Sequence, residues 1–164
     1  MKFRSVLRGM VVPACAVAGL VMAAAPSVAA PAPVGQHCVA NIVTGVQKCY
    51  SSEADAAKFG TGERVATVPL VTFYDGYNKG PSSYTARGPR ACSTSTTDYD
   101  YSHPNMANFG WNDRASSVVT FNHCDIWFSS DKNYEGECGN RWIDSSMDLR
   151  VQSCNNRASS YDLS

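Results

Sequence analysis

A six-residue sequence occurs twice in the chain, and its side chains are the first that could do chemistry. Residues 112–117 read Asn-Asp-Arg-Ala-Ser-Ser, and residues 155–160 read Asn-Asn-Arg-Ala-Ser-Ser, forty-three positions later. Five of the six positions are identical, and the remaining one has Asp113 in the first copy and Asn156 in the second. Asn, Asp and Ser favour turns, because their side-chain oxygens bond to neighbouring amides. The hexamers therefore predict two related polar turns, and turn formation alone would explain their composition.

Other reactive residue types do not form catalytic patterns. The sequence has three histidines, His37, His103 and His123, which make neither His-x-x-x-His nor His-x-Glu. Cys-x-x-Cys is also absent from the sequence. A zinc centre is therefore not expected. Ser116 and Ser159 lie outside any Gly-x-Ser-x-Gly sequence, which argues against a serine hydrolase. We expect that the protein is not an enzyme.

A second, looser repeat precedes the two hexamers. Residues 73–82 parallel residues 128–138, since each segment starts with phenylalanine and passes through a polar turn to a glycine, Gly80 or Gly136. Two matches in the same order indicate two copies of one structural unit. The unit resembles the Greek-key motif of the βγ-crystallin superfamily. In that motif an aromatic strand and a hairpin ending in Gly-x-Ser precede a hexamer of the form Asn/Asp-Asn/Asp-x-x-Ser/Thr-Ser.

The resemblance covers about residues 65–164 and implies an all-β fold. Both hexamers fit the family's pattern, and Gly80-Pro81-Ser82 fits Gly-x-Ser, whereas Cys138 stands where the second copy should have serine. We expect two Greek-key motifs forming a βγ-crystallin-like sandwich over residues 64–164. Motif one would span about 64–121 and motif two about 122–164.

The resemblance also implies two Ca²⁺ sites, each drawing ligands from both hexamers. Second positions would give side-chain oxygens, third positions backbone carbonyls and fifth positions hydroxyls. These metal ligands would be Asp113, Arg114, Ser116, Asn156, Arg157 and Ser159. A hairpin carbonyl near Gly76 or Asp131 would complete each shell. Since affinity for Ca²⁺ falls with fewer anionic ligands, the site that uses Asp113 should be the tighter one.

The leading interpretation is a secreted, disulfide-stabilised, non-enzymatic calcium-binding protein. One alternative is an inhibitor of extracellular metallopeptidases, because secreted bacterial inhibitors of that kind resemble a single βγ-crystallin domain. Residues 79–90 or 93–104 would then supply the inhibitory loop. Another alternative is a toxin-like module that binds an envelope component. The discriminating observation is whether shortening the long loop abolishes activity, as it would for an inhibitor and not for a calcium module.

The N-terminal residues 1–29 have the parts of a secretory signal. A basic start precedes an apolar run over residues 10–25, and Ser-Val-Ala ends at Ala29. The run is shorter than the roughly 20 residues that a transmembrane helix needs, so we expect an extracellular protein without a stable membrane anchor. Cleavage would leave eleven Lys and Arg against fourteen Asp and Glu, a net charge of −3. This balance disfavours nucleic acid as a partner, and the absence of an exposed heptad favours a monomer.

Cleavage would also remove Cys15 and leave six cysteines. An even number in an exported chain predicts three disulfides, although six cysteines allow fifteen pairings. The expected pairs are Cys38–Cys49, Cys92–Cys124 and Cys138–Cys154. The first would close a small hairpin, and the other two would restrain the two motifs separately.

Short runs of β-forming residues alternate with Gly, Pro, Asn, Asp and Ser after residue 64. They predict strands at residues 65–68, 71–74, 117–121, 126–128 and 149–151. Residues 30–63 would be a leader with an accessory hairpin over 38–49, followed by a short helix over 52–60. Ser52 would cap the start of that helix and Gly60 would end it.

The aromatic residues have two possible roles. Trp111, Trp127, Trp142 and the tyrosines at 99–101 could stack on sugars or bases. We expect instead that Trp127 fills the core and that Trp111 packs against the loop beside its hexamer. The tyrosines lie in a longer loop of motif one, at about 93–104, and binding residues often occupy such loops.

Overall fold

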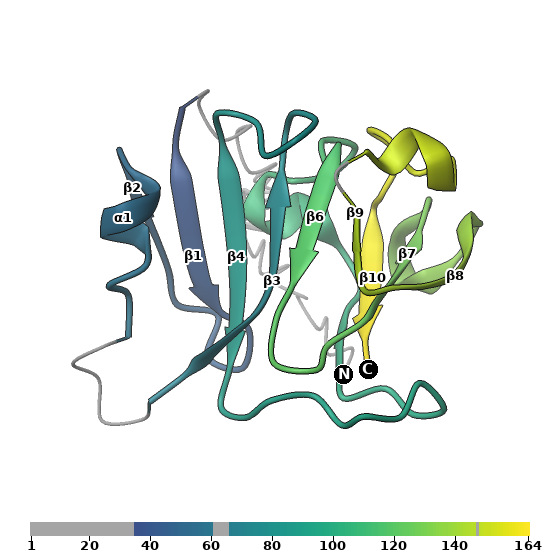
Figure 1. The fold of residues 1–164 in the computed structure, drawn as a ribbon, viewed down its shortest axis with the longest axis horizontal. Coiled ribbons are helices and arrows are strands. Elements are labelled where there is room, and N and C mark those ends of the chain that lie inside the picture. The colour runs from purple at the N-terminus through teal and green to yellow at the C-terminus, as the bar shows by residue number, and fades with distance from the viewer. Residues whose placement is uncertain (1–34, 61–65, 147) are drawn as a thin grey trace, which may run out of the picture.

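Two β-sheets pack face to face around an aromatic core (Figure 1). The computed structural model describes residues 35–60, 66–146 and 148–164, so the expected signal peptide lies outside the described residues. The first sheet has the order β2-β1-β4-β3-β6-β9, with bounds β1 His37–Asn41, β2 Gln47–Tyr50, β3 Val68–Tyr74, β4 Ser83–Gly88, β6 Ser117–Thr120 and β9 Ser145–Ser146. The second has the order β5-β10-β7-β8, with bounds β5 Tyr101–His103, β7 Ile126–Ser129, β8 Cys138–Ile143 and β10 Ser160–Leu163.

The strand order confirms two Greek-key motifs, one from β3 to β6 and one from β7 to β10. In each motif the fourth strand returns to lie beside the first: β6 pairs with β3, and β10 pairs with β7. The third strand of each motif crosses to the other sheet, so that β5 pairs with β10 and β9 pairs with β6. The sandwich therefore consists of two interlocked copies of one unit, as the internal repeat predicts.

The N-terminal hairpin forms as the sequence predicts, whereas the helix begins at its predicted cap but ends at Ala56 and not at Gly60. The Cys38–Cys49 disulfide joins β1 to β2, and Gly45 donates its amide to Asn41 in the turn between them. Ser52 caps helix α1, Glu53–Ala56, by accepting a hydrogen bond from the amide of Asp55. The sequence did not reveal that β1 pairs in parallel with β4, so the hairpin extends the first sheet at its edge (Figure 1).

Trp111, and not Trp127, fills the core. The ring of Trp111 is fully buried, with its centroid 6.3 Å from that of Phe73 and 6.3 Å from that of Tyr84. Trp127 lies between Ile126 and Phe128, which are both fully buried, and successive strand residues point to opposite faces. Trp127 is therefore half-buried on the outer face of the second sheet, so the prediction that it fills the core was wrong. Trp111 does contact its hexamer, through Arg114, but the sequence did not reveal that it also fills the core.

Two strand predictions also need correction. Residues 149–151 belong to the 3₁₀ helix η3, Leu149–Gln152, because Asp148 caps this turn by accepting from the amide of Arg150 at 3.0 Å. Leu149 alone faces the core, and Val151 is exposed. In the predicted strand over residues 65–68, only Val68 is a strand residue among those described. At residues 149–151 the local hydrogen bond of Asp148 outweighs the β-propensity of two apolar residues.

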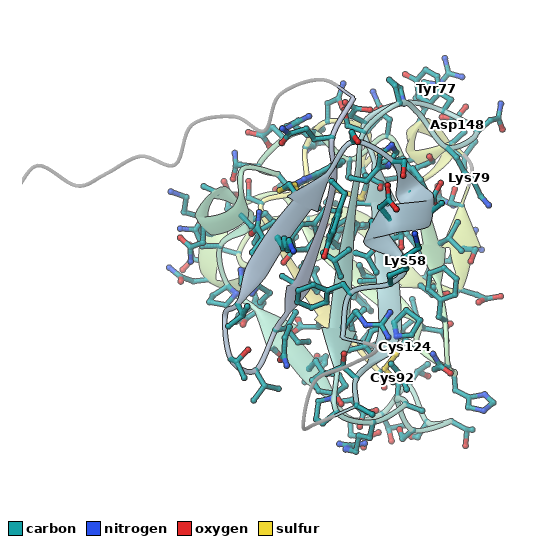
Figure 2. The ribbon with its side chains drawn as sticks, turned by 90° about the vertical axis from the view of Figure 1, so that its left-hand side faces the viewer. Lys58, Tyr77, Lys79, Cys92, Cys124 and Asp148 are labelled. Atoms are coloured by element: carbon teal, nitrogen blue, oxygen red, sulfur yellow. A yellow bond between two sulfur atoms is a disulfide. The ribbon has the colours of Figure 1, made fainter. Side chains whose placement is uncertain are left out.

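The structure contains the three disulfides that the sequence predicts, Cys38–Cys49, Cys92–Cys124 and Cys138–Cys154. Figure 2 shows the Cys92–Cys124 bond at one end of the molecule, with Tyr77 and Lys79 at the other end. Tyr77 and Lys79 belong to the hairpin between β3 and β4. The Cys92–Cys124 disulfide therefore closes the sandwich at the end opposite to this hairpin.

Burial of His103 should make the protein less stable at acidic pH. Its ring lies 4.7 Å from that of Phe109 and 5.7 Å from that of Tyr161, and burial lowers the pKa of the imidazole. Below the ordinary histidine pKa of about 6.5, the unfolded chain therefore binds more protons than the native chain. The free energy of unfolding should fall as the pH drops through this value toward the lower native pKa. Urea midpoints at pH 7.5 and 5.5 measure the effect.

Two variants isolate the contribution of His103. His103→Gln should reduce the loss of stability between these pH values, whereas Val151→Ala, which changes an exposed residue without a titratable group, should leave it unaltered. An equal loss in the wild type and in His103→Gln would contradict the assignment.

Candidate metal centre

The two hexamers cross each other through a reciprocal pair of backbone hydrogen bonds. The amide of Asp113 donates to the carbonyl of Ala158 at 3.0 Å, and the amide of Asn156 donates to the carbonyl of Ala115 at 2.9 Å. Asp113 and Asn156 both have positive φ, 56° and 52°. Asn and Asp tolerate this left-handed conformation better than other non-glycine residues. The second position of each hexamer thus needs one of these two residues to make the turn.

The crossing brings together side chains from opposite motifs. Ser116 Oγ donates to Asn156 Oδ1 at 3.0 Å, and Ser159 Oγ lies 3.5 Å from Asp113 Oδ1. Both serines are buried. The fifth residue of each hexamer therefore meets the second residue of the other, and all four belong to the ligand set expected from the sequence.

Each hexamer also holds the hairpin of its own motif through its last serine. Ser117 Oγ donates to the carbonyl of Gly76 at 2.7 Å, and Ser160 Oγ donates to the carbonyl of Asp131 at 2.6 Å. The same hydroxyls accept from the amides of Lys79 and Tyr134, respectively. The hairpin carbonyls named from the sequence are therefore each held by the last serine of a hexamer, in equivalent positions of the two motifs.

Arg114 and Arg157 turn their side chains back over the preceding turn. Arg114 Nη1 donates to the carbonyl of Gly110 at 3.1 Å, and Arg157 Nη1 donates to the carbonyl of Ser153 at 2.9 Å. The Arg114 guanidinium also lies 4.8 Å from the ring centroid of Trp111 and 3.3 Å from a carboxylate oxygen of Asp75. The positive charges are therefore partly balanced by local oxygens. That the backbone carbonyls of these arginines bind metal stays a prediction.

The first residue of each hexamer, absent from the predicted ligand set, carries an unsatisfied oxygen. Asn112 Oδ1 and Asn155 Oδ1 are buried without a hydrogen-bond partner among the described residues. Buried acceptors of this kind are rare, since lost hydration costs free energy. The hexamer repeat contains both residues, so their equivalence was visible in the sequence, whereas their burial was not.

The oxygens gathered here suit a hard cation. The described residues hold no cluster of three His, Cys, Asp or Glu side chains placed to bind a metal. The crossed hexamers instead offer hydroxyl, amide and carbonyl oxygens together with the single carboxylate of Asp113. Such neutral oxygens fit Ca²⁺, which takes carbonyls and water alongside few acids, better than they fit zinc.

Comparison with known proteins finds similarity in structure only. No family model and no curated protein matches the chain. A structure from work on the evolution of the eye-lens βγ-crystallin domain fold shares 21% identity over 58% of this chain and 84% of that chain, with a TM-score of 0.43. A βγ-crystallin from an archaeon shares 19% over 58% and 96%, with a TM-score of 0.42. A βγ-crystallin domain from Clostridium beijerinckii shares 17% over 57% and 95%, with a TM-score of 0.41.

The strand order itself defines the class of fold. Two Greek-key motifs exchange their third strands, and their repeated hexamers cross at the interface between the motifs. The chain therefore has a βγ-crystallin-like fold, with a disulfide-closed hairpin and a short helix added before the first motif.

Proposed function

We propose that the protein is a secreted, non-enzymatic calcium-binding protein that holds one ion at each crossing of the hexamers. The observation that carries the proposal is the contact of Ser116 with Asn156 and of Ser159 with Asp113. These contacts gather oxygens from both motifs at two equivalent places. Ca²⁺ binds six to eight oxygens from carboxylates, carbonyls, hydroxyls and water. The bound ion would link the motifs through these groups and the hairpin carbonyls of Gly76 and Asp131.

Secretion agrees with the three disulfides and with the small number of carboxylates among the proposed calcium ligands. Three disulfides are typical of proteins that fold in an oxidising compartment. Among the described residues, no helix has the length and hydropathy to cross a membrane. Sites with few carboxylates have the millimolar to submillimolar affinity of extracellular calcium modules.

Calcium should stabilise the native protein. If only the native state binds, a hundredfold excess over Kd adds about 2.7 kcal/mol to the free energy of unfolding for one site. This corresponds to a rise of several degrees in Tm. Circular dichroism melts of the oxidised mature protein in EGTA and in increasing concentrations of CaCl₂, up to about a hundredfold above Kd, measure the shift.

Two variants that exchange only charge locate the sites. Asp113→Asn should reduce the calcium-dependent rise in Tm, and Asn156→Asp should increase it, because both replacements tolerate the left-handed backbone. Asp98→Asn, at an exposed loop residue, serves as the control and should keep the wild-type shift. A protein without any calcium response, or three variants with identical responses, would contradict the proposal.

A further inference from the structure

A row of four residues crosses the outer face of the second sheet from one edge to the other. Asp162 on β10 lies opposite Ser102 on β5 and opposite Trp127 on β7. Trp142 on β8 completes the row, since its ring contacts that of Trp127 edge-to-face at 5.7 Å. We call Ser102, Asp162, Trp127 and Trp142 the outer row.

A fifth residue extends the aromatic half of the outer row. Tyr99, just before β5 in the long loop of motif one, is 67% exposed, and its ring centroid lies 5.8 Å from that of Trp142. Trp127 and Trp142 are half-buried, so part of each indole remains accessible. Three aromatic rings therefore gather on this face of the molecule, and each leaves part of its surface accessible.

The fold itself does not require aromatic residues in these positions. The equivalent row of the first sheet runs through Ser145, Val119, Thr72 and Thr85, which pair in the same registers. Thr72 is buried there, and its hydroxyl bonds to that of Thr85. Because the two motifs are copies of one unit, the exchange of threonines for tryptophans is a property of this face and not of the sandwich.

The other half of the outer row is polar. Ser102 Oγ donates to Asp162 Oδ1 at 2.5 Å. Partial burial raises the pKa of Asp162. The pKa of the Tyr134 phenol is also raised, first by burial and then by the negative charge of the Asp162 carboxylate. Tyr134 is 40% exposed, so a hydroxyl, a phenol and a carboxyl group lie together beside the indoles.

We propose that the outer row, with Tyr99 and Tyr134, is a binding site for a neutral polysaccharide. The apolar C–H face of a pyranose ring stacks on aromatic rings, while its hydroxyls need the donors and acceptors that Ser102 and Asp162 present. The carboxylate in the row repels the phosphates of a nucleic acid, which disfavours nucleic acid as the stacking partner. Four strands about 4.8 Å apart give the row the length of a short oligosaccharide.

Retention on insoluble sugars and titration with soluble ones test the site. The oxidised mature protein is applied to cellulose and to chitin, and its tryptophan fluorescence is titrated with cellohexaose and chitohexaose. We expect retention on at least one polymer and a change in fluorescence with its hexasaccharide. Trp142→Ala and Trp127→Ala should each weaken binding by about tenfold or more, since each removes a stacking surface. Phe121→Ala, at a 37% exposed aromatic residue outside the row, should bind as the wild type does.

Controls distinguish a loss of the binding site from a loss of the fold. Circular dichroism tests whether each variant is folded. Tyr99→Ala is included because its side chain is 67% exposed, so its removal should not disturb the fold. Wild-type protein that binds none of the four sugars would overturn the proposal, and so would equal binding by Trp142→Ala. Binding of oligo-dT that the same variants abolish would overturn the choice of saccharide. Repeating the titration in EGTA separates this site from the calcium sites.

Discussion

Trp111→Ala is expected to lower the free energy of unfolding by about 3–5 kcal/mol, the largest effect of any single substitution considered for this chain. Trp111 is fully buried and packs beside Phe73 and Tyr84, so truncation leaves a cavity that the two sheets can fill only in part. The residue also directly precedes the hexamer at Asn112. Chemical denaturation of the oxidised protein, with an unchanged m-value, measures the loss.

Trp127→Ala is the matched control, because this tryptophan is half-buried on the outer face. Its replacement should cost clearly less than that of Trp111. Trp111→Phe offers a further comparison: the indole nitrogen of Trp111 is buried without a partner among the described residues, so loss of its N–H should offset part of the lost packing. A larger cost at Trp127 than at Trp111 would reverse the assignment of the core residue.

Replacing both Cys92 and Cys124 with alanine is expected to cost about 3.7 kcal/mol by the chain-entropy relation, because the bond closes a separation of 32 residues. Both cysteines are buried, so the variant also loses some packing. The disulfide lies at the end of the sandwich away from the hairpin that carries Tyr77 (Figure 2). The calcium-dependent rise in Tm should therefore persist in this variant, although the Tm itself falls.

The corresponding variant of Cys38 and Cys49 provides the comparison. This bond closes a separation of 11 residues, for which the same relation gives about 2.8 kcal/mol. Denaturant midpoints of the two double variants should keep this order. If removal of the N-terminal bond were the more damaging change, stabilisation by the disulfides would have to arise from native contacts and not from loop closure.

The sequence predicted the parts of the fold that depend on repeated segments or on contacts between residues close in sequence. Identical residue types at equal spacing gave the two motifs, because a duplicated sequence folds into duplicated structure. The resemblance named Asp113 and Ser159 as ligands without pairing them, and the structure places their side-chain oxygens 3.5 Å apart. Ser52 was found as a cap because its bond to Asp55 is local.

The errors concern which face of a strand is buried and which strands meet. Ile126, Trp127 and Phe128 are all apolar, so hydrophobicity alone does not fix the register, and the large indole was placed inside. The parallel pairing of β1 with β4 joins residues about 46 positions apart and leaves no periodic signal. The outer row has the same character, because Ser102, Asp162 and Trp127 become neighbours only when strands far apart in the sequence pair.

The exchange of β5 and β9 makes the two halves of the molecule mutually dependent. A chain cleaved at the exposed His123, between the motifs, would give fragments that each lack a strand of their own sheet and carry one that belongs to the other. Neither fragment could complete a sandwich alone, yet together they hold every strand, with the Cys92–Cys124 bond still joining them. Each motif therefore needs a strand of the other to complete its sheet. A substitution that unfolds one motif thus also removes a strand from the other.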